Sequence, residues 1–214
     1  MGICYIVGAA NTTLILKQSM IKNDDCVIAA DGGYRLLQQW AIKSDQVVGD
    51  FDSLGYVPSE EQVSQYPSEK DDTDMMIAVK TGLSQGYRQF VILGGLGGRL
   101  DHTLANIHAL DYLVEHGARG CLMGDEENVL LIDSGSHIVF RAEAVDRFSI
   151  FAYGGKAEGV NLTGLKYPLK DAVLTTDFPI GVSNEFTGRE ATISIRRGKL
   201  LVIWTGSITL CDWI

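Results

Sequence analysis

Two aspartates one residue apart, Asp50 and Asp52, directly follow the apolar pair Val47–Val48 and Gly49. β-Branched residues of this kind are typical of the end of a buried strand, and a glycine releases the chain into a loop. In an extended backbone, side chains two positions apart project to the same side, so we expect the two carboxylates to converge. Paired carboxylates suit a hard cation such as Mg²⁺, which substrate phosphates often help to coordinate. A surface turn rich in Asp is the alternative interpretation.

Further carboxylates occupy similar positions. Asp31 follows the strand-like run 26–30, and Asp71, Asp72 and Asp74 stand at the predicted start of a helix. Asp71 could be the N-cap of that helix, with the others as partners of its dipole. This alternative accounts less well for six acidic residues at loop positions predicted to share one rim. Unpaired carboxylates are costly to bury, so the clustering favours a site for a metal ion and phosphates.

A glycine-rich segment, Gly94–Arg99, joins a predicted strand to a predicted helix. It lacks the third glycine of the dinucleotide fingerprint and the Gly-Lys-Ser/Thr of a P-loop. Exposed amides at a helix N-terminus nevertheless favour phosphate, and the planar guanidinium of Arg99 can grip phosphate oxygens. A bare turn is the alternative for the glycines, and a capping or packing role is the alternative for His102.

The composition describes an acidic globular protein. The chain has 214 residues, of which 46% are hydrophobic and 21% charged, and its formal net charge is -9. The length fits one large and one small domain. The negative charge argues against binding nucleic acid, because that binding depends on Lys and Arg. A bound metal ion would supply the positive charge that a nucleotide requires.

Targeting signals are not evident in the sequence. The N-terminus lacks a basic region followed by a long apolar run, so we expect no signal peptide. No window reaches the apolar length of a membrane span. The cysteines are far apart and lack the spacing of a metal site. We therefore expect a cytoplasmic protein with reduced cysteines and no membrane partner.

The first half of the chain alternates strand and helix patterns. Short apolar runs predict strands at 3–7, 26–30, 46–48, 63–66, 90–93 and 120–123. Helices are predicted from residue 11 or 12 to about 21, at 34–42, from about 75 to Gly86, and at 101–116, where Leu104 belongs to the apolar stripe. Strand–helix units with short connections imply a parallel sheet covered on both faces, an α/β/α arrangement. Ligands bind at the carboxyl ends of such strands, which is where the acidic residues fall.

The pattern changes near residue 126. Short strand-like runs follow at 129–132, 138–140, 148–152, 192–195 and 200–204, with predicted turns that include Gly154–Gly155 and a hairpin tip at Arg197–Lys199. The fold class expected from the whole sequence is therefore α/β. An N-terminal α/β/α domain, residues 1–126, would bind nucleotide and metal, and a smaller antiparallel β-sandwich domain would occupy residues 127–214.

Several motifs together resemble the thiamine pyrophosphokinase family. The resemblance is specific over roughly residues 25–110 and looser in the β half. The matching segments are Ala30-Asp31-Gly32-Gly33 with Arg35, Gly49-Asp50-Phe51-Asp52-Ser53, Lys70-Asp71-Asp72-Thr73-Asp74, Gly97-Gly98-Arg99-Leu100-Asp101-His102 with Asn106, Gly159-Val160, Gly164 to Leu169, and Ser183-Asn184-Glu185-Phe186. The resemblance implies a homodimer with active sites between the subunits, and transfer of pyrophosphate from Mg-ATP to thiamine, giving thiamine diphosphate and AMP.

The resemblance also assigns roles to individual residues. It implies that Mg²⁺ is held by Asp31, Asp50, Asp52 and Asp74. It implies that ATP is contacted by Asp31, Arg35, Lys70, Asp71, Thr73, Arg99 and His102. The catalytic group would comprise Asp52, Asp74, Arg99 and Asp101. Thiamine would meet Ser183, Asn184 and Phe186. Some relatives stack thiamine on a tryptophan near this point of the chain, and here Phe186 occupies the nearest aromatic position.

Two other functions remain open from the sequence. Another Mg²⁺-dependent phosphotransferase or phosphohydrolase would use the same acidic rim on a different substrate. A non-catalytic sensor of nucleotide or thiamine would bind its ligands without turnover. The set of Asp50, Asp52, Asp74 and Arg99 argues against the sensor, because a protein that only binds does not need all four.

Overall fold

The computed structural model of the protein describes residues 2–52, 54–58, 63–66, 71–141, 147–188 and 190–206. The chain divides into two compact units, residues 1–125 and 126–214. The division falls one residue before the predicted domain boundary. No helix in the described ranges combines the length and apolar character needed to cross a membrane.

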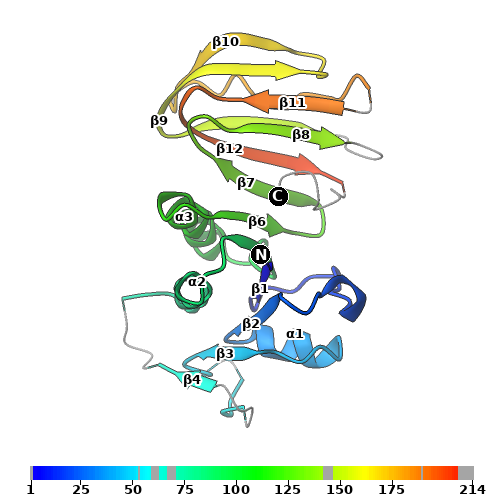
Figure 1. Ribbon diagram of the computed structural model, residues 1–214, viewed down its shortest axis with the longest axis vertical. Coiled ribbons are helices and arrows are strands. Elements are labelled where there is room, and N and C mark those ends of the chain that lie inside the picture. Colours follow the sequence, from blue (N-terminus) through cyan, green and yellow to red (C-terminus); the bar gives the residue numbers. More distant parts are fainter. Residues whose placement is uncertain are drawn as a thin grey trace. The chain divides into compact units, whose positions relative to one another are not determined.

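The first unit is built on a parallel sheet with the strand order β4-β3-β2-β1-β5-β6 (Figure 1). Its strands are β1 (Cys4–Val7), β2 (Cys26–Ala30), β3 (Gln46–Gly49), β4 (Val63–Gln65), β5 (Gln89–Leu93) and β6 (Arg119–Met123). All residues of β1 and β2 are buried, as expected for strands covered on both faces. From β1 the chain builds the sheet outward to β4, and then returns to add β5 and β6 on the other side. The point between β1 and β5 is therefore the topological switch point, where ligands bind in sheets of this kind.

Three helices connect these strands within the described residues: α1 (Gly33–Gln39), α2 (Asp74–Ser84) and α3 (Leu100–Glu115). Right-handed crossovers place α2 and α3 together on one face of the sheet and α1 on the other (Figure 1). The parallel sheet with helices on both faces confirms the fold class predicted for the first half.

Two details of this unit differ from the sequence-based expectation. The helix predicted from residue 11 or 12 to about 21 is absent from these described residues, where only a short 3₁₀ turn, η1 (Gln18–Met20), forms. The backbone N–H groups of Thr13 and Leu14 instead donate to the carboxylate of Asp125. Leu104 is 50% exposed, because Asn106, with the apolar residues one and two turns after it, forms the buried side of α3.

The second unit is an antiparallel β domain. Its strands are β7 (Glu127–Ile132), β8 (His137–Arg141), β9 (Phe148–Thr163), β10 (Leu169–Leu174), β11 (Glu190–Ser194) and β12 (Arg197–Thr205). They are ordered β7-β12-β9-β11-β8, with β10 pairing the second half of β9. Phe140 packs edge-on against Phe148 and Trp204 in the core, with ring centroids 5.0 and 5.5 Å apart. An antiparallel β domain after an α/β domain is the order that the sequence predicts.

Two predicted turns in this domain are wrong. Gly154 and Gly155 lie inside the long strand β9, although Gly154 has a φ of 67°. The predicted hairpin tip at Arg197–Lys199 is the start of β12. β11 and β12 do not form a hairpin because β9 lies between them in the sheet.

Candidate active site

The carboxyl ends of β2 and β3 bring Asp31 and Asp50 together. The two strands are paired in parallel, and the N–H of Asp31 donates to the carbonyl of Val48 at 2.8 Å. Gly49 makes this approach possible, because a Cβ there would lie 3.0 Å from the Cα of Asp31. Asp31 itself has a φ of 47°, in the left-handed region that Asp tolerates better than most residues. The local backbone therefore places two carboxylates side by side at the sheet edge.

The third carboxylate comes from the first turn of α2. Asp74 is the first residue of that helix, and Thr73 is its N-cap. The Thr73 hydroxyl oxygen accepts a hydrogen bond from the N–H of Met76 at 3.1 Å. The capping role considered for Asp71 thus belongs to Thr73, which fixes where the helix starts and so where Asp74 points.

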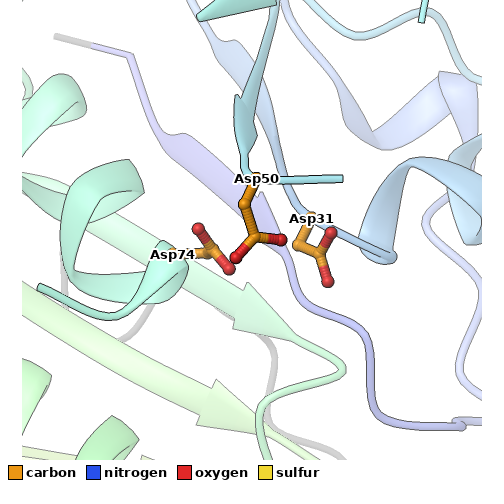
Figure 2. A group of neighbouring side chains, drawn as sticks. All are labelled: Asp31, Asp50 and Asp74. Atoms are coloured by element: carbon orange, nitrogen blue, oxygen red, sulfur yellow. The ribbon is translucent and has the colours of Figure 1, made fainter. Parts of the chain in front are cut away.

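Asp31, Asp50 and Asp74 form a compact acidic cluster (Figure 2). One carboxylate oxygen from each lies within 4.8 Å of the others, and all three side chains are half-buried. Oδ1 of Asp31 is buried and has no hydrogen-bond partner among the described residues. A buried carboxylate oxygen without a donor is costly unless a cation compensates it. The donor set of hard oxygens therefore fits a divalent ion of the Mg²⁺ type.

Asp52 does not join this cluster. The expectation that Asp50 and Asp52 project together assumed an extended backbone, but the strand ends at Gly49 and the next residues turn. Phe51 is buried and has a φ of 64°, and the N–H of Asp52 donates to Oδ1 of Asp50 at 3.0 Å. The turn leaves the Asp52 side chain exposed. A left-handed φ in a bulky residue is strained, and such strain is concentrated at functional sites.

A cavity of about 510 Å³ opens beside the acidic cluster. It lies at the switch point between β1 and β5. Its walls are the segment Gly8–Ala10 after β1, Ala30 and Asp31 at the end of β2, residues 71–75 at the start of α2, the glycine loop after β5, and the first turns of α3. Its volume is typical of sites for small ligands and cofactors.

Two glycine segments form one side of this cavity. A Cβ on Gly94 would lie 2.4 Å from the carbonyl oxygen of Gly8, so the loops after β1 and β5 pack backbone to backbone. The side chain of Asn106 is buried on α3 and donates to the carbonyl of Gly95 at 2.7 Å. Asn106 therefore fixes the glycine loop to the helix that follows it.

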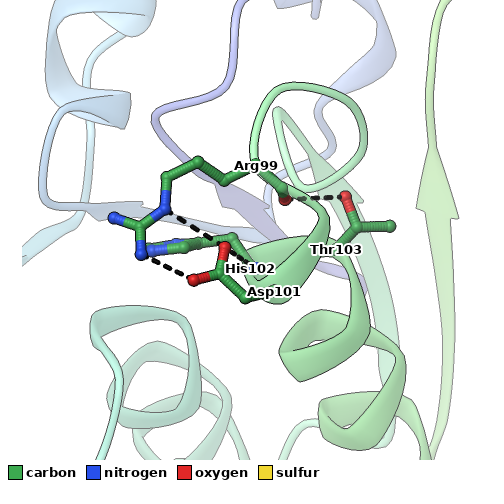
Figure 3. Close-up of polar contacts among 4 residues, drawn as sticks. All are labelled: Arg99, Asp101, His102 and Thr103. Carbon is green, nitrogen blue, oxygen red and sulfur yellow. Dashed lines mark hydrogen bonds and ion pairs between the residues drawn. The ribbon is translucent and has the colours of Figure 1, made fainter.

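Arg99 and Asp101 form a two-pronged ion pair at the N-terminus of α3 (Figure 3). Arg99 Nε donates to Asp101 Oδ1 at 3.1 Å, and Nη2 donates to Oδ2 at 2.6 Å. The backbone N–H of His102 also donates to Asp101. The hydrogen bond from Arg99 is the main reason that the pKa of Asp101 lies below its ordinary value of 3.8. Asp101 and His102 line the cavity, whereas Arg99 does not.

The remaining predicted nucleotide contacts divide between the cavity and its surroundings. Asp31, Asp71 and Thr73 line the cavity together with His102. Arg35 is exposed on α1 and is not among the lining residues. Lys70 and Ser53 lie outside the described residues. Asp72, next to this group, is paired with Lys80 at 2.6 Å.

The predicted thiamine contacts belong to the second unit. Ser183 is exposed and has a φ of 59°. Asn184 is buried. Its side-chain oxygen accepts from the Tyr167 N–H at 2.9 Å, and its side-chain nitrogen donates to the Tyr167 carbonyl at 2.8 Å. Phe186 packs edge-on against Phe148. In this structure the Asn184 side chain binds the backbone of Tyr167, and contact of the three residues with thiamine stays a prediction.

The sequence reasoning missed several residues that shape this site. The wall Gly8–Ala10 was not singled out, although small residues directly after the first strand are a detectable signal. Asn106 was noted only for the family resemblance, and its polar side chain on the buried stripe of a helix marks it as unusual. No local signal identifies Asp125, whose contacts lie more than 100 residues away in the sequence.

Both units match models of one protein family. The model described as thiamin pyrophosphokinase, catalytic domain, matches residues 17–122, and the model described as thiamin pyrophosphokinase, vitamin B1 binding domain, matches residues 136–200. The chain is 28% identical over 182 residues to the thiamine pyrophosphokinase of Bacillus subtilis (strain 168), covering 82% of this chain and 85% of that protein. It is 27% identical over 177 residues to thiamin pyrophosphokinase 1 of Caenorhabditis elegans, covering 78% of this chain and 71% of that protein.

Solved structures agree with the sequence relatives. The crystal structure of the B. subtilis thiamine pyrophosphokinase superposes with a TM-score of 0.83 at 25% identity, covering 96% of this chain and 99% of that chain. The Geobacillus thermodenitrificans structure gives 0.79 at 25% identity, covering 96% and 98%. Fold and family models together define a two-domain kinase with a catalytic α/β domain. The chain belongs to the thiamin pyrophosphokinase family, which confirms the resemblance stated from its motifs.

Proposed function

We propose that this chain transfers the pyrophosphoryl group of ATP to the hydroxyethyl oxygen of thiamine, giving thiamine diphosphate and AMP. This is the reaction of the family to which the chain belongs. The observation that carries the proposal is the acidic cluster of Asp31, Asp50 and Asp74 beside a cavity at the switch point of the sheet.

The cluster supports Mg²⁺ as the metal. Three carboxylates with one buried, unpartnered oxygen match the preference of Mg²⁺ for carboxylate oxygen together with substrate phosphates. When bound, the ion supplies positive charge that offsets the charge of the triphosphate and of the transition state. Asp52, two residues from Asp50, is proposed as a further contributor from the same loop.

The other residues position the substrates. In the reaction the thiamine oxygen forms a bond to the β-phosphorus, the bond from that phosphorus to the oxygen of the α-phosphate breaks, AMP leaves, and the hydroxyl proton is released. Such a transfer depends on alignment and on charge neutralisation more than on covalent catalysis. The amides of the glycine loop and the N-terminus of α3 can donate to phosphate oxygens. Arg99, which pairs with Asp101 through Nε and Nη2, is proposed as a donor to phosphate near the same place. Lys70, Asp71, Thr73, His102 and Arg35 are proposed as further nucleotide contacts.

The proposal extends to the assembly and its location. The resemblance of motifs implies a homodimer, in which thiamine meets Ser183, Asn184 and Phe186, and we propose a cytoplasmic location for it. Exposed apolar side chains on the second unit, such as Val173, Phe178 and Ile180, suit an interface of this kind.

Incubation with thiamine, ATP and Mg²⁺ tests the function. We expect AMP and thiamine diphosphate to form in a one-to-one ratio, and neither product to form when thiamine or the metal ion is omitted. Release of inorganic phosphate without thiamine would favour a phosphohydrolase. Binding of both ligands without any turnover would favour a sensor.

A further inference from the structure

The segment that follows β1 is bound at residues 12–14 by one distant carboxylate, that of Asp125. Oδ1 of Asp125 accepts hydrogen bonds from the Thr12 hydroxyl at 2.5 Å, the Thr13 N–H at 2.8 Å and the Leu14 N–H at 3.2 Å. Oδ2 also accepts from the Thr13 N–H, at 2.9 Å. Asp125 lies two residues beyond β6, which is separated from β1 by β5 in the sheet order. The carboxylate therefore ties the β1 loop across the carboxyl edge of the sheet.

This loop carries one wall of the cavity. Gly8, Ala9 and Ala10 line the cavity, and Thr12 follows them after one residue. The wall is also held from beneath, because the N–H groups of Gly8 and Ala10 donate to the carbonyls of Leu93 and Gly94 at 2.8 and 3.0 Å. The wall is thus fixed at its base by backbone contacts to β5 and its loop, and beyond its far end, at residues 12–14, by Asp125.

The charge state of the Asp125 carboxylate suits this role. The hydrogen bond from the Thr12 hydroxyl, with those from Thr13 and Leu14, lowers the pKa of Asp125 below its ordinary value of 3.8. It is therefore ionised at neutral pH and acts only as an acceptor, which matches the three donors that face it. Asp125 does not line the cavity and is not part of the acidic cluster.

We propose that Asp125 is a positioning residue for the nucleotide, which acts by holding the Gly8–Ala10 wall in the conformation that receives ATP. This rests on the proposed function, because it takes the cavity to be the nucleotide site. Removal of the carboxylate leaves the Thr12 hydroxyl and the Thr13 N–H without their acceptor, and the Leu14 N–H keeps its second bond, to the Thr12 hydroxyl oxygen at 3.1 Å. The loop then samples other conformations, and ATP must order it on binding.

The test compares Asp125→Ala and Asp125→Asn with a matched control, Asp25→Ala. Asp25 also accepts two backbone N–H groups, from Ile3 and Lys22, each at 2.8 Å, but at the amino end of β1, away from the cavity. Thr12→Val is a milder variant that removes the hydroxyl, which donates to Asp125 and accepts from the Leu14 N–H, but keeps the carboxylate. Steady-state kinetics with ATP and thiamine are measured for each protein, with hydrogen–deuterium exchange of peptides spanning residues 8–14.

We expect Asp125→Ala to raise the KM for ATP about tenfold, the effect of losing one to two hydrogen bonds in the ordered loop. The kcat and the KM for thiamine should each change by less than about threefold. The rate of hydrogen–deuterium exchange at residues 8–14 should rise in the absence of nucleotide. Thr12→Val should give a smaller change in the same direction. Asp25→Ala should leave the KM for ATP and exchange in this loop unchanged.

Three outcomes would overturn the proposal. The first is faster exchange at residues 8–14 with an unchanged KM for ATP, which would mean that the wall does not serve the nucleotide. The second is an equal loss in the Asp25 and Asp125 variants, which would reduce Asp125 to a stabilising residue. The third is failure of the wild-type protein to bind ATP at all, which would refute the proposed function itself. This outcome is distinguishable from the other two because it is measured on the wild-type protein alone.

Discussion

Asp50 and Asp52 are separated by one residue and have different surroundings. Asp50 faces Asp31 and Asp74 in the acidic cluster, whereas the turn at Phe51 leaves Asp52 exposed. The residue types therefore do not decide which of the two carboxylates belongs to the cluster. The backbone conformation of Phe51, which lies between them, decides it.

The first prediction concerns this pair. Asp50→Asn should lower kcat/KM by about a hundredfold or more, because it removes a charge directly from the cluster. Asp52→Asn should cost about tenfold or less, since its backbone N–H still donates to Asp50. Initial rates of AMP formation measure both. An equal loss in the two variants would mean that the loop rearranges and that Asp52 binds the metal directly, as the family resemblance implies.

The second prediction concerns the Arg99–Asp101 ion pair. Arg99 depresses the pKa of Asp101, so the pair is intact above the ordinary pKa of 3.8 and is lost only as the pH falls through the lower, folded-state value. Asp101 should therefore remain ionised throughout the range from about pH 5 to 9. NMR titration of the side-chain carboxyl carbon should show its pKa rising toward 3.8 in Arg99→Ala. An unchanged pKa in that variant would contradict the ion pair.

Residue types were predictable from the sequence to a useful degree, and their geometry less so. Asp31, Asp50 and Asp74 were identified because each follows a strand or opens a helix, positions that a parallel sheet gathers at one edge. The divergence of Asp52 was not predictable, because a left-handed φ in a phenylalanine has no local signal. The burial of Asn184 was equally hidden, since its partner Tyr167 is 17 residues away.

At the scale of elements, α2 connects helix capping to the acidic cluster. Its N-cap, Thr73, is exposed and lines the cavity, and the next residue is Asp74. An error in the starting point of this helix would displace Asp74 from Asp31 and Asp50. The cap is therefore expected to contribute to both stability and metal binding.

The third prediction follows from this connection. Thr73→Val should lower the free energy of unfolding by about 1 kcal/mol, the usual value of an N-cap, and the melting temperature by roughly 2–4 °C. It should also raise the Mg²⁺ concentration that gives half-maximal activity. Thr73→Ser, which keeps the hydroxyl, should behave like the wild-type protein in both measurements. If Thr73→Val lost stability but kept its Mg²⁺ dependence, the cap would not position Asp74.

Elements were predictable where short apolar runs end at glycine or a polar turn, as in β1, β2, β3, β5 and β6. Prediction failed where a distant contact decides the local structure. Thr12 is a possible helix cap, yet the N–H groups of Thr13 and Leu14 donate to Asp125. In β9, glycines that usually mark turns lie within a continuous strand because β12 and β10 pair with it on either side of them.

At the scale of the whole molecule, the acidic cluster and the predicted thiamine contacts belong to different units of the chain. The family models follow the same division, with one matching residues 17–122 and the other residues 136–200. In the proposed homodimer, one subunit contributes the nucleotide site and its partner contributes thiamine contacts.

The fourth prediction tests this sharing of sites. Two variants, Asp50→Asn and Ser183→Trp, should each be nearly inactive, the second because a bulky side chain would fill the thiamine site. After mixing, unfolding and refolding, random pairing should restore about a quarter of the wild-type activity, because half of the dimers are mixed and each has one intact site. Asp50→Asn refolded alone is the control. No recovery on mixing would place both parts of the site in the same subunit.

The proposed reaction depends most on a divalent ion held by Asp31, Asp50 and Asp74. Two ionised carboxylates of this cluster, with oxygens within 4.8 Å of each other, have a repulsion energy of roughly 1 to 3 kcal/mol, depending on how well water screens them. Neutralising one carboxylate should therefore raise the melting temperature of the metal-free protein while it weakens metal binding.

The most direct measurement is electron paramagnetic resonance titration of Mn²⁺ in the presence of a non-hydrolysable ATP analogue. The wild-type protein should bind the ion at this cluster, and Asp31→Asn and Asp50→Asn should each weaken its affinity at least about tenfold. Asp171→Asn, which changes an exposed carboxylate in the second unit, should bind Mn²⁺ as the wild-type protein does. Equal affinity for Mn²⁺ in all four proteins would contradict the account.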